Sequence, residues 1–173
     1  MKNYLILLLI ALTITSCEQI PAESFSKDGV SLTSPEGWEI TDREEIDEGV
    51  YYLSIEKSGM KSSGLFALTW VEGDMDIYEW IEIYKNELQD NIIYKNSNLT
   101  FENVQKDSFN GITTVALKYA VSVLTIDHVG IIHFVHKDNK TFAILRQEAV
   151  EDLVKNEKGF NAIEQSFNVN LID

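Results

Sequence analysis

Residues 112–136 read ITTVALKYAVSVLTIDHVGIIHFVH, and this stretch decides the fold because it holds two long strand patterns separated by a short connection. In Ile112–Val123, apolar or β-branched side chains alternate with small or polar ones, which places the two sets on opposite faces of a strand. Val129–His136 is apolar on both faces and must be covered on both. Strands joined by so short a connection pair antiparallel. The stretch therefore predicts the centre of an antiparallel sheet.

The rest of the chain adds further strands and one strong amphipathic helix. Asp76 is a favourable N-cap, and apolar residues recur after it at helical spacing until about Asn91: Ile77, Trp80, Ile81, Tyr84 and Leu88. Val150–Val154 and Phe160–Phe167 predict two short helices near the end. Strand patterns occupy residues 29–33, 50–57, 65–71, 99–106 and 141–146, and Trp38 opens a further extended segment after the Pro35-Glu36-Gly37 turn. Further turns are expected at Asn110-Gly111 and Asp138-Asn139. We expect an α+β fold, an antiparallel sheet of about six strands with helices on both faces.

Several short motifs, taken in order, resemble the PsbP-like superfamily. They are Pro35-Glu36-Gly37-Trp38, the helix after the fourth strand, Phe109-Asn110-Gly111 before a long hairpin, and Ser166-Phe167. The resemblance covers roughly residues 28–169 and lies in turn and core positions, so it implies a fold more than a function. It implies an antiparallel sheet between helices and a non-catalytic binding or assembly role, and it supplies no catalytic residues to transfer.

The first residues predict export and lipid anchoring. Lys2 precedes an apolar run, Tyr4–Ile14, which is shorter than the roughly 20 residues needed to span a bilayer. Ile14-Thr15-Ser16-Cys17 resembles a bacterial lipobox, in which the cysteine becomes the acylated first residue. We predict a signal peptide over residues 1–16, a lipidated tether over residues 17–24 with Cys17 as the lipidation site, and a single domain over residues 25–173. A plain cleaved signal followed by a chance cysteine is the alternative.

Composition limits the compartment and the partners. Without residues 1–16 the chain has 13 basic and 28 acidic residues, a formal charge of −15. Nucleic acid and anionic headgroups repel such a chain, so we expect no nucleic-acid partner and membrane contact through the acyl chains. Acidity favours a basic protein partner, such as a secreted or envelope protein. Glu18 stands where aspartate would signal inner-membrane retention, which favours the outer membrane, and a lipidated Cys17 leaves no thiol for catalysis.

The histidines lie close in sequence, but strand geometry separates them. His128, His133 and His136 are five and three residues apart, and odd separations place side chains on opposite faces. His128 and His136 share a face but lie about 27 Å apart at roughly 3.3 Å per residue. A bulge near Gly130 would move one of these histidine side chains to the other face of the strand. Because a metal site usually needs three or four convergent ligands, we predict no metal site here.

Two acidic clusters are the remaining candidates for cation binding. Asp42, Glu44, Glu45, Asp47 and Glu48 flank Arg43 in a predicted loop, and Glu72, Asp74 and Asp76 precede the helix. Neither segment has the spacing, the glycine and the terminal glutamate of a calcium loop. Acids also stabilise helix N-termini and keep loops solvated. We predict no metal and no cofactor, with a divalent cation at one of these clusters as the alternative.

Patterns for nucleophilic catalysis or an aromatic pocket are weak. Ser24-Phe25-Ser26-Lys27 and Ser58-Gly59-Met60-Lys61 fit Ser-x-x-Lys but lack the partner motifs of the penicillin-binding class. Trp70, Tyr78, Trp80 and Tyr84 are aromatic candidates for a pocket. Helical spacing assigns Trp80 and Tyr84 to the core and leaves Tyr78 as an exposed contact.

Three functions follow from these patterns. We favour a lipid-anchored, non-catalytic module of the cell envelope that binds or assembles a protein partner. The alternatives are a carrier of a small ligand or divalent cation, and an envelope enzyme with an unrecognised site. An enzyme would need a concave cluster of carboxylates or histidines with shifted pKa values. A closed core without a polar pocket would exclude both alternatives, and an exposed acidic or apolar surface would support the first function.

Overall fold

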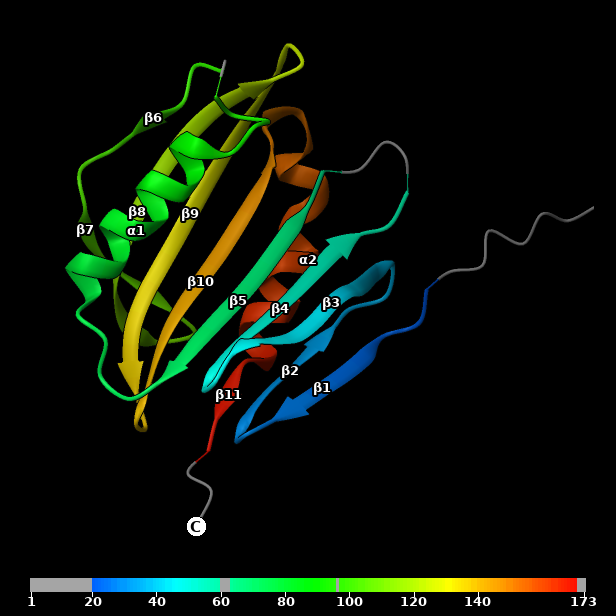
Figure 1. Ribbon diagram of the computed structural model, residues 1–173. Helices are drawn as coiled ribbons and strands as arrows, with labels where there is room; N and C mark the ends of the chain where they lie inside the picture. Colours follow the sequence, from blue (N-terminus) through cyan, green and yellow to red (C-terminus); the bar gives the residue numbers. More distant parts are fainter. Residues whose placement is uncertain (1–19, 60–62, 96, 171–173) are drawn as a thin grey trace, which may run out of the picture.

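The protein is described by a computed structural model over residues 20–59, 63–95 and 97–170 (Figure 1). Its large sheet contains β3 (Trp38–Asp47), β4 (Val50–Lys57), β5 (Leu65–Glu72), β6 (Thr100–Phe101), β7 (Gln105–Phe109), β8 (Ile112–Val123), β9 (Ile126–Lys137) and β10 (Lys140–Ala149). A three-stranded sheet contains β1 (Glu23–Lys27), β2 (Val30–Ser34) and β11 (Asn168–Val169). The helices are α1 (Ile77–Asp90), the 3-10 turn η1 (Val150–Asp152) and α2 (Leu153–Ser166).

The large sheet is antiparallel throughout and has the order β3-β4-β5-β10-β9-β8-β6, with β7 also paired to β8. This confirms the predicted α+β class, but the sheet has eight strands rather than about six. The extended segment predicted to open at Trp38 is the start of β3, but β3 continues through the acidic residues that were predicted as a loop. Pairing with β4 makes it a strand despite the low strand propensity of aspartate and glutamate.

The strand predicted over residues 99–106 is two strands, β6 and β7. Phe101 pairs with Tyr119 of β8, whereas Gln105 pairs with Ala116. Four positions separate Phe101 from Gln105, whereas three separate their partners Tyr119 and Ala116 on β8. The edge therefore has one extra residue, which interrupts the ladder as a bulge does.

The predicted hairpin turns are confirmed. Asn110 and Gly111 join β7 to β8 at φ values of 44° and 74°, and Asp138 and Asn139 join β9 to β10 at 50° and 59°. Two-residue turns of this kind need positive φ at both positions, which asparagine, aspartate and glycine adopt readily.

Helix α1 begins and ends where the sequence predicts. The Asp76 carboxylate accepts hydrogen bonds from the Tyr78 and Glu79 amides at 2.8 and 2.9 Å, and Asn91 is the C-cap. Trp80 and Ile81 are buried in one core cluster with Leu117, Ile132 and Phe134. In Figure 1, α1 crosses in front of the large sheet.

The two short C-terminal helices were predicted wrongly, because η1 leads into one continuous helix. The apolar residues taken to mark the first helix, Val150, Leu153 and Val154, are exposed, while α2 buries Asn156, Phe160 and Ile163. A hydrophobic pattern cannot register a polar residue such as Asn156 on the core face.

Helix α2 and the three-stranded sheet contribute to a second core cluster (Figure 1). Phe66 and Leu68 of β5 belong to this cluster, whereas Ala67 between them belongs to the cluster of α1. Neighbouring residues of a strand point to opposite faces, so the two clusters lie on opposite sides of β5. β1 begins at Glu23, inside the residues predicted as a tether.

Candidate functional site

Strand β3 forms one edge of the large sheet, and within the described ranges it pairs with β4 alone. Trp38 and Ile40 at its start are buried, but residues 41–47 are all exposed. Register shifts at Thr41 and Ile46 bend this exposed half. The outer side of the strand therefore presents backbone N–H and C=O groups that can pair with another extended chain.

Carboxylates dominate this strand and the turn that follows it. We call Asp42, Glu44, Glu45, Asp47 and Glu48 the acidic edge, and every one of these residues is exposed. The structure places these residues together, as predicted, but they lie on a strand and its turn rather than in a loop. By strand alternation, Asp42 and Glu44 project from one face and Glu45 from the other.

The local electrostatics at the acidic edge are negative. Arg43, the single basic residue of β3, forms an ion pair with Glu23 of β1 at 2.8 Å. Burial raises the pKa of the Tyr52 phenol on β4, and the carboxylates of Asp42 and Glu44 add to that rise. The edge therefore keeps an excess of negative charge for an approaching cation.

The buried start of β3 holds this edge in place. Trp38 packs on Phe160 of α2 with ring centroids 4.9 Å apart. Gly159 allows the close approach, because a Cβ at that position would lie 2.3 Å from Trp38 Nε1. The acidic edge thus continues from a segment fixed by α2.

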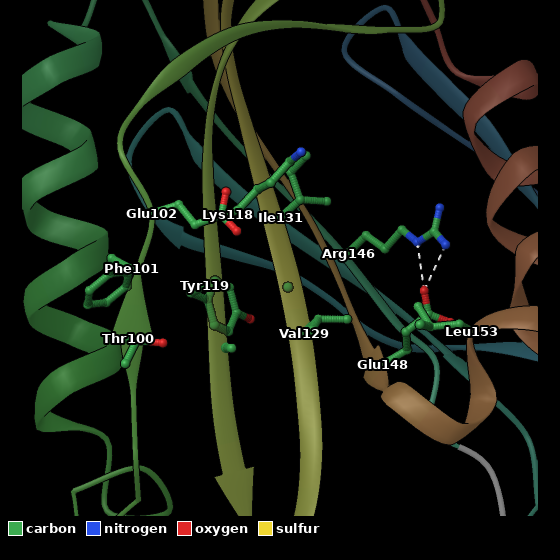
Figure 2. A pocket seen from close by; sticks show the side chains of 12 residues that line it. Thr100, Phe101, Glu102, Lys118, Tyr119, Val129, Ile131, Arg146, Glu148 and Leu153 are labelled. Carbon is green, nitrogen blue, oxygen red and sulfur yellow. Dashed lines mark hydrogen bonds and ion pairs between the residues drawn. The ribbon is translucent and has the colours of Figure 1, made fainter.

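A pocket of about 490 Å³ opens over the part of the large sheet that is distant from β3. Residues of β6, β8, β9, β10 and the start of α2 line it (Figure 2). Lys118, Ile131 and Arg146 are cross-strand neighbours along it. Ala120, Val129 and Leu153 add apolar lining. Pockets that hold small ligands measure about 300–1,000 Å³, so this one is large enough for such a molecule.

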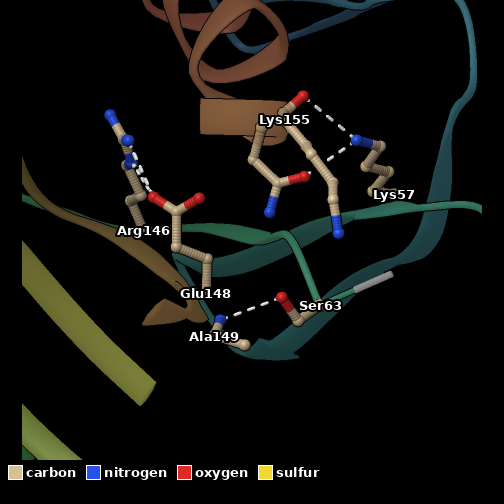
Figure 3. A network of polar contacts seen from close by, with 7 residues as sticks. Lys57, Ser63, Arg146, Glu148, Ala149 and Lys155 are labelled. Atoms are coloured by element: carbon tan, nitrogen blue, oxygen red, sulfur yellow. Dashed lines mark hydrogen bonds and ion pairs between the residues drawn. The ribbon is translucent and has the colours of Figure 1, made fainter. Parts of the chain in front are cut away.

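Glu148 is the buried carboxylate of this pocket and is only 2% exposed. Its Oε1 accepts hydrogen bonds from Arg146 Nε and Nη2 at 3.0 and 2.7 Å, as Figure 3 shows. Its Oε2 has no hydrogen-bond partner among the residues described, and neither has Asn156 Nδ2. Because a buried polar atom without a partner is costly, and Glu148 lines the pocket whereas Asn156 does not, Glu148 Oε2 is the atom that favours a polar ligand here.

A neighbouring polar cluster, centred on Asp152, binds η1 and α2 to the sheet. Asp152, 4% exposed, accepts hydrogen bonds from Lys155 at 2.5 Å and Ser63 at 2.8 Å, and these contacts lower the pKa of its carboxyl group. Ser63 in turn accepts from the Ala149 amide. This carboxylate is engaged in holding the fold together.

The histidines do not converge. His133 is buried and pairs with Thr114 at 2.9 Å on the side of the α2 cluster, and burial lowers its pKa. His136 lies on the other face beside Thr141 at 2.8 Å and Asp74 at 3.8 Å. Within the described residues, no group of three or more histidine, cysteine, aspartate or glutamate side chains could hold a metal ion.

The other predicted sites are dispersed. Ser24 and Lys27 lie on β1, where their separation of three residues places them on opposite faces, and Lys27 pairs with Asp28 at 3.0 Å. Cys17 and the Lys61 of the second Ser-x-x-Lys pattern lie outside the described residues. Trp70 and Trp80 are core residues, and Tyr78 is 66% exposed. In the ranges described, no helix is long and apolar enough to cross a membrane.

Sequence reasoning missed the pocket and the pair of unpartnered atoms. Arg146 and Glu148 sit two residues apart in β10, a spacing that places them on one strand face. That spacing was the available signal, but it identifies a face and not the cavity beside it.

No protein-family model matches the sequence, and no curated protein sequence matches it. Solved structures that are similar to the chain include the following three. Cyanobacterial PsbP (CyanoP) from Synechocystis sp. PCC 6803 has a TM-score of 0.56 and 15% identity, over 94% of this chain and 99% of that one. LpqN of Mycobacterium tuberculosis, which is involved in cell envelope biogenesis, has a TM-score of 0.54 and 10% identity, over 87% of this chain and 91% of that one. Pseudomonas aeruginosa PA94 has a TM-score of 0.50 and 12% identity, over 87% of this chain and 99% of that one. At these identities the likeness concerns the fold, and the chain has a PsbP-like α+β fold.

Proposed function

We propose that this chain is a lipid-anchored protein of the cell envelope and that its domain is a non-catalytic module that binds a protein partner along β3. The observation that carries the proposal is the exposed edge of β3 together with its acidic side chains. The partner it fits is a basic segment that adds as an extended strand.

Edge geometry and charge act together in this proposal. An unpaired strand edge offers backbone hydrogen bonds to any extended chain. Five carboxylates on and beside that edge repel a second copy of the same edge and attract a basic segment. The edge is therefore closed to self-association and selective for a partner of opposite charge.

We propose that acyl chains on Cys17 hold the protein at the outer membrane. The fold similarity to LpqN, a protein of cell envelope biogenesis, is consistent with an envelope location. Replacement Cys17→Ser should release the protein from carbonate-washed membranes without changing its circular dichroism spectrum. Retention of the variant in those membranes would contradict the anchor.

The absence of catalysis is part of the proposal. Two buried ionisable groups make structural contacts, His133 with Thr114 and Asp152 with Lys155 and Ser63, while the buried Glu148 binds Arg146 through one oxygen and leaves the other without a partner. Such contacts support a role in stabilising the fold for these groups.

Residue-specific crosslinking tests the binding edge. A photoreactive amino acid replaces Glu44 of β3 in intact cells, and the matched control replaces Lys106, which is exposed on β7 at the other edge. We expect a discrete adduct with a basic protein from position 44 and none from position 106. Equal adducts from both edges, or adducts only from position 106, would refute the proposal.

A small-ligand carrier is the second candidate, and the pocket with the unpartnered Glu148 Oε2 favours it. Native mass spectrometry of protein purified gently from membranes would detect a bound molecule. Ala120→Trp should fill the pocket and remove that mass, while Asn161→Trp on the exposed face of α2 should retain it. The same mass in both variants, or none in the wild type, would exclude this function.

A further inference from the structure

Exposed apolar side chains gather at one end of the large sheet. Ten large hydrophobic residues in the described ranges are exposed, and seven of them lie at this end: Ile92, Ile93, Leu124, Ile126, Val150, Leu153 and Val154. Leu124 and Val154 are almost fully exposed, at 89% and 87%. We call these seven residues the apolar end. Concentrations of this kind mark interaction surfaces, whereas single exposed residues need no explanation.

Strand pairing places these segments together. The β8–β9 turn holds Leu124 and leads into β9, where His128 pairs with Ala149 just before η1. Thr100 pairs with Ala120, so residues 97–99 just before it lie toward the same turn. Figure 1 shows the β8–β9 turn and the start of α2 at one end of the sheet. Ile46, by contrast, lies beside the β3–β4 turn at the opposite end.

The N-terminal segment enters the fold at this same end. The Gly37 amide donates a hydrogen bond to the Ile20 carbonyl at 2.9 Å, and Gly37 precedes β3 where Trp38 pairs with Lys57. Glu56 pairs with Leu65, and Leu65 pairs with Gln147 close to η1. Cys17 precedes Ile20 by three positions, and a fully extended chain of that length spans at most about 10 Å. An anchor on Cys17 therefore holds this end of the sheet beside the bilayer.

The β8–β9 turn departs from the usual turn residues. Leu124 and Thr125 both have positive φ, at 49° and 72°. The same kind of turn uses Asn110-Gly111 between β7 and β8, which adopts these angles at little cost. Leucine and a β-branched threonine are unfavourable there. The strained turn nevertheless places a leucine at the tip, almost fully exposed.

We infer that the apolar end docks on the lipid bilayer, so that the domain itself, and not the acyl chains alone, contacts the membrane. The inference rests on the proposed anchor for its geometry, and the occupant is a lipid surface. Because Asp127 and Glu151 are also exposed at this end, the contact is apolar and does not depend on anionic lipid. Docking leaves the β3–β4 turn, at the opposite end, facing away from the bilayer.

Depth measurements with a single fluorescent label test the inference. The full chain carries one added cysteine, Val154→Cys or Ile126→Cys, labelled with an environment-sensitive fluorophore, and Glu48→Cys at the opposite end is the control. Two preparations are placed on phosphatidylcholine vesicles. One is the protein purified from membranes, and the other carries Cys17→Ser with an N-terminal decahistidine tag on nickel-chelating lipid.

The two preparations separate the inference from the anchor. Flotation of the untagged wild-type chain with vesicles reports the anchor, whereas the tagged chain is held at the bilayer whether or not Cys17 is acylated. We expect labels at positions 154 and 126 to shift to the blue and to be quenched by lipids with brominated acyl chains, and the label at position 48 to stay accessible to iodide. Equal iodide quenching at all three positions in the tagged chain would overturn the inference.

A double variant distinguishes docking from a packing effect. Leu124→Asn with Thr125→Gly restores a favourable turn, so it should raise the thermal midpoint of the domain. The same variant should lower the docking equilibrium constant, read from the label at position 126, by roughly tenfold, because a fully buried leucine contributes about that factor. A more stable variant with unchanged lipid quenching would show that Leu124 does not enter the bilayer and would contradict the inference.

Discussion

The two edges of the large sheet are protected in different ways. On one side, β6 and β7 are strands of two and five residues, interrupted by an extra residue, so they offer little continuous ladder. On the other side, β3 has ten residues, and its exposed half carries the acidic edge. Short strands and bulges exclude every extended chain, whereas charge excludes only chains of like charge.

This difference teaches where a partner can bind. The β7 edge carries both Lys106 and Asp107, so it has no preferred sign. The β3 edge has a single arginine, and that residue is engaged with Glu23. Selectivity for a basic segment therefore belongs to the β3 edge. Variants that alter one edge at a time test this assignment.

The largest expected effect concerns the buried start of β3. Gly159→Ala would place a methyl group against the Trp38 ring, which is 3% exposed and cannot move aside. Overpacking costs about 1–3 kcal/mol, and we expect it to outweigh the ~1 kcal/mol that alanine adds to a helix. Urea unfolding should therefore show a lower midpoint.

Lys158→Ala, on the exposed face of the same helix, is the control and should change stability by less than about 0.5 kcal/mol. Glu44→Ala in the free half of β3 should behave like the control. An unchanged midpoint for Gly159→Ala would show that α2 does not fix the edge through Trp38.

Neutralising the acidic edge should reduce partner binding without affecting stability. In Asp42→Asn/Glu44→Gln/Glu45→Gln, each lost rim charge removes about 0.2–1 kcal/mol, so the yield of the specific crosslink should fall roughly tenfold. High salt should mimic this loss in the wild type. Asp107→Asn with Glu102→Gln at the other edge is the matched control, and an equal loss in that control would remove the distinction between the edges.

The third effect is smaller and concerns His133, which lies under the β7 edge beside Phe109. Burial lowers its pKa below the ordinary value of 6.5, while Asp107 and Glu164 oppose that shift and Lys118 and Arg146 add to it. The unfolded chain therefore binds a proton at a pH where the folded chain does not. The contribution of His133 to the free energy of unfolding should be fully present above pH 6.5, and it should fall as the pH drops below that value.

Unfolding midpoints measured between pH 7.5 and pH 5 should show this decline. His133→Gln should flatten the decline. The same slope in His133→Gln as in the wild type would assign the pH dependence to other groups.

Much of the fold could be predicted because local signals agree with the tertiary structure. The pattern of β8, the Asp76 cap and the Asn110-Gly111 turn each specify one conformation without reference to distant residues. The start of β3 at Trp38 was predicted, but its acidic half was predicted as a loop, because that half is a strand through pairing with β4 and its own composition favours a loop. Asn156 escaped prediction because a polar residue on a core face needs a distant partner, Lys57, to be recognised.

The acidic residues of the candidate site were identified from sequence, but their setting was not. Alternation along β10 places Arg146 and Glu148 on one face, yet the pocket beside them depends on where β6 and the start of α2 lie. The apolar end is also a property of the assembled sheet. Its residues come from three separate segments that meet only after the strands have paired.

Amide hydrogen exchange is the most direct test of the central claim, that a basic segment adds to β3. The chain is compared alone and in complex with the protein captured at position 44. Backbone amides within residues 41–47 should gain protection in the complex, and amides of β7 should not, because a new strand forms hydrogen bonds to the free side of β3 alone. Unchanged exchange over residues 41–47, with protection elsewhere on the domain, would contradict the account.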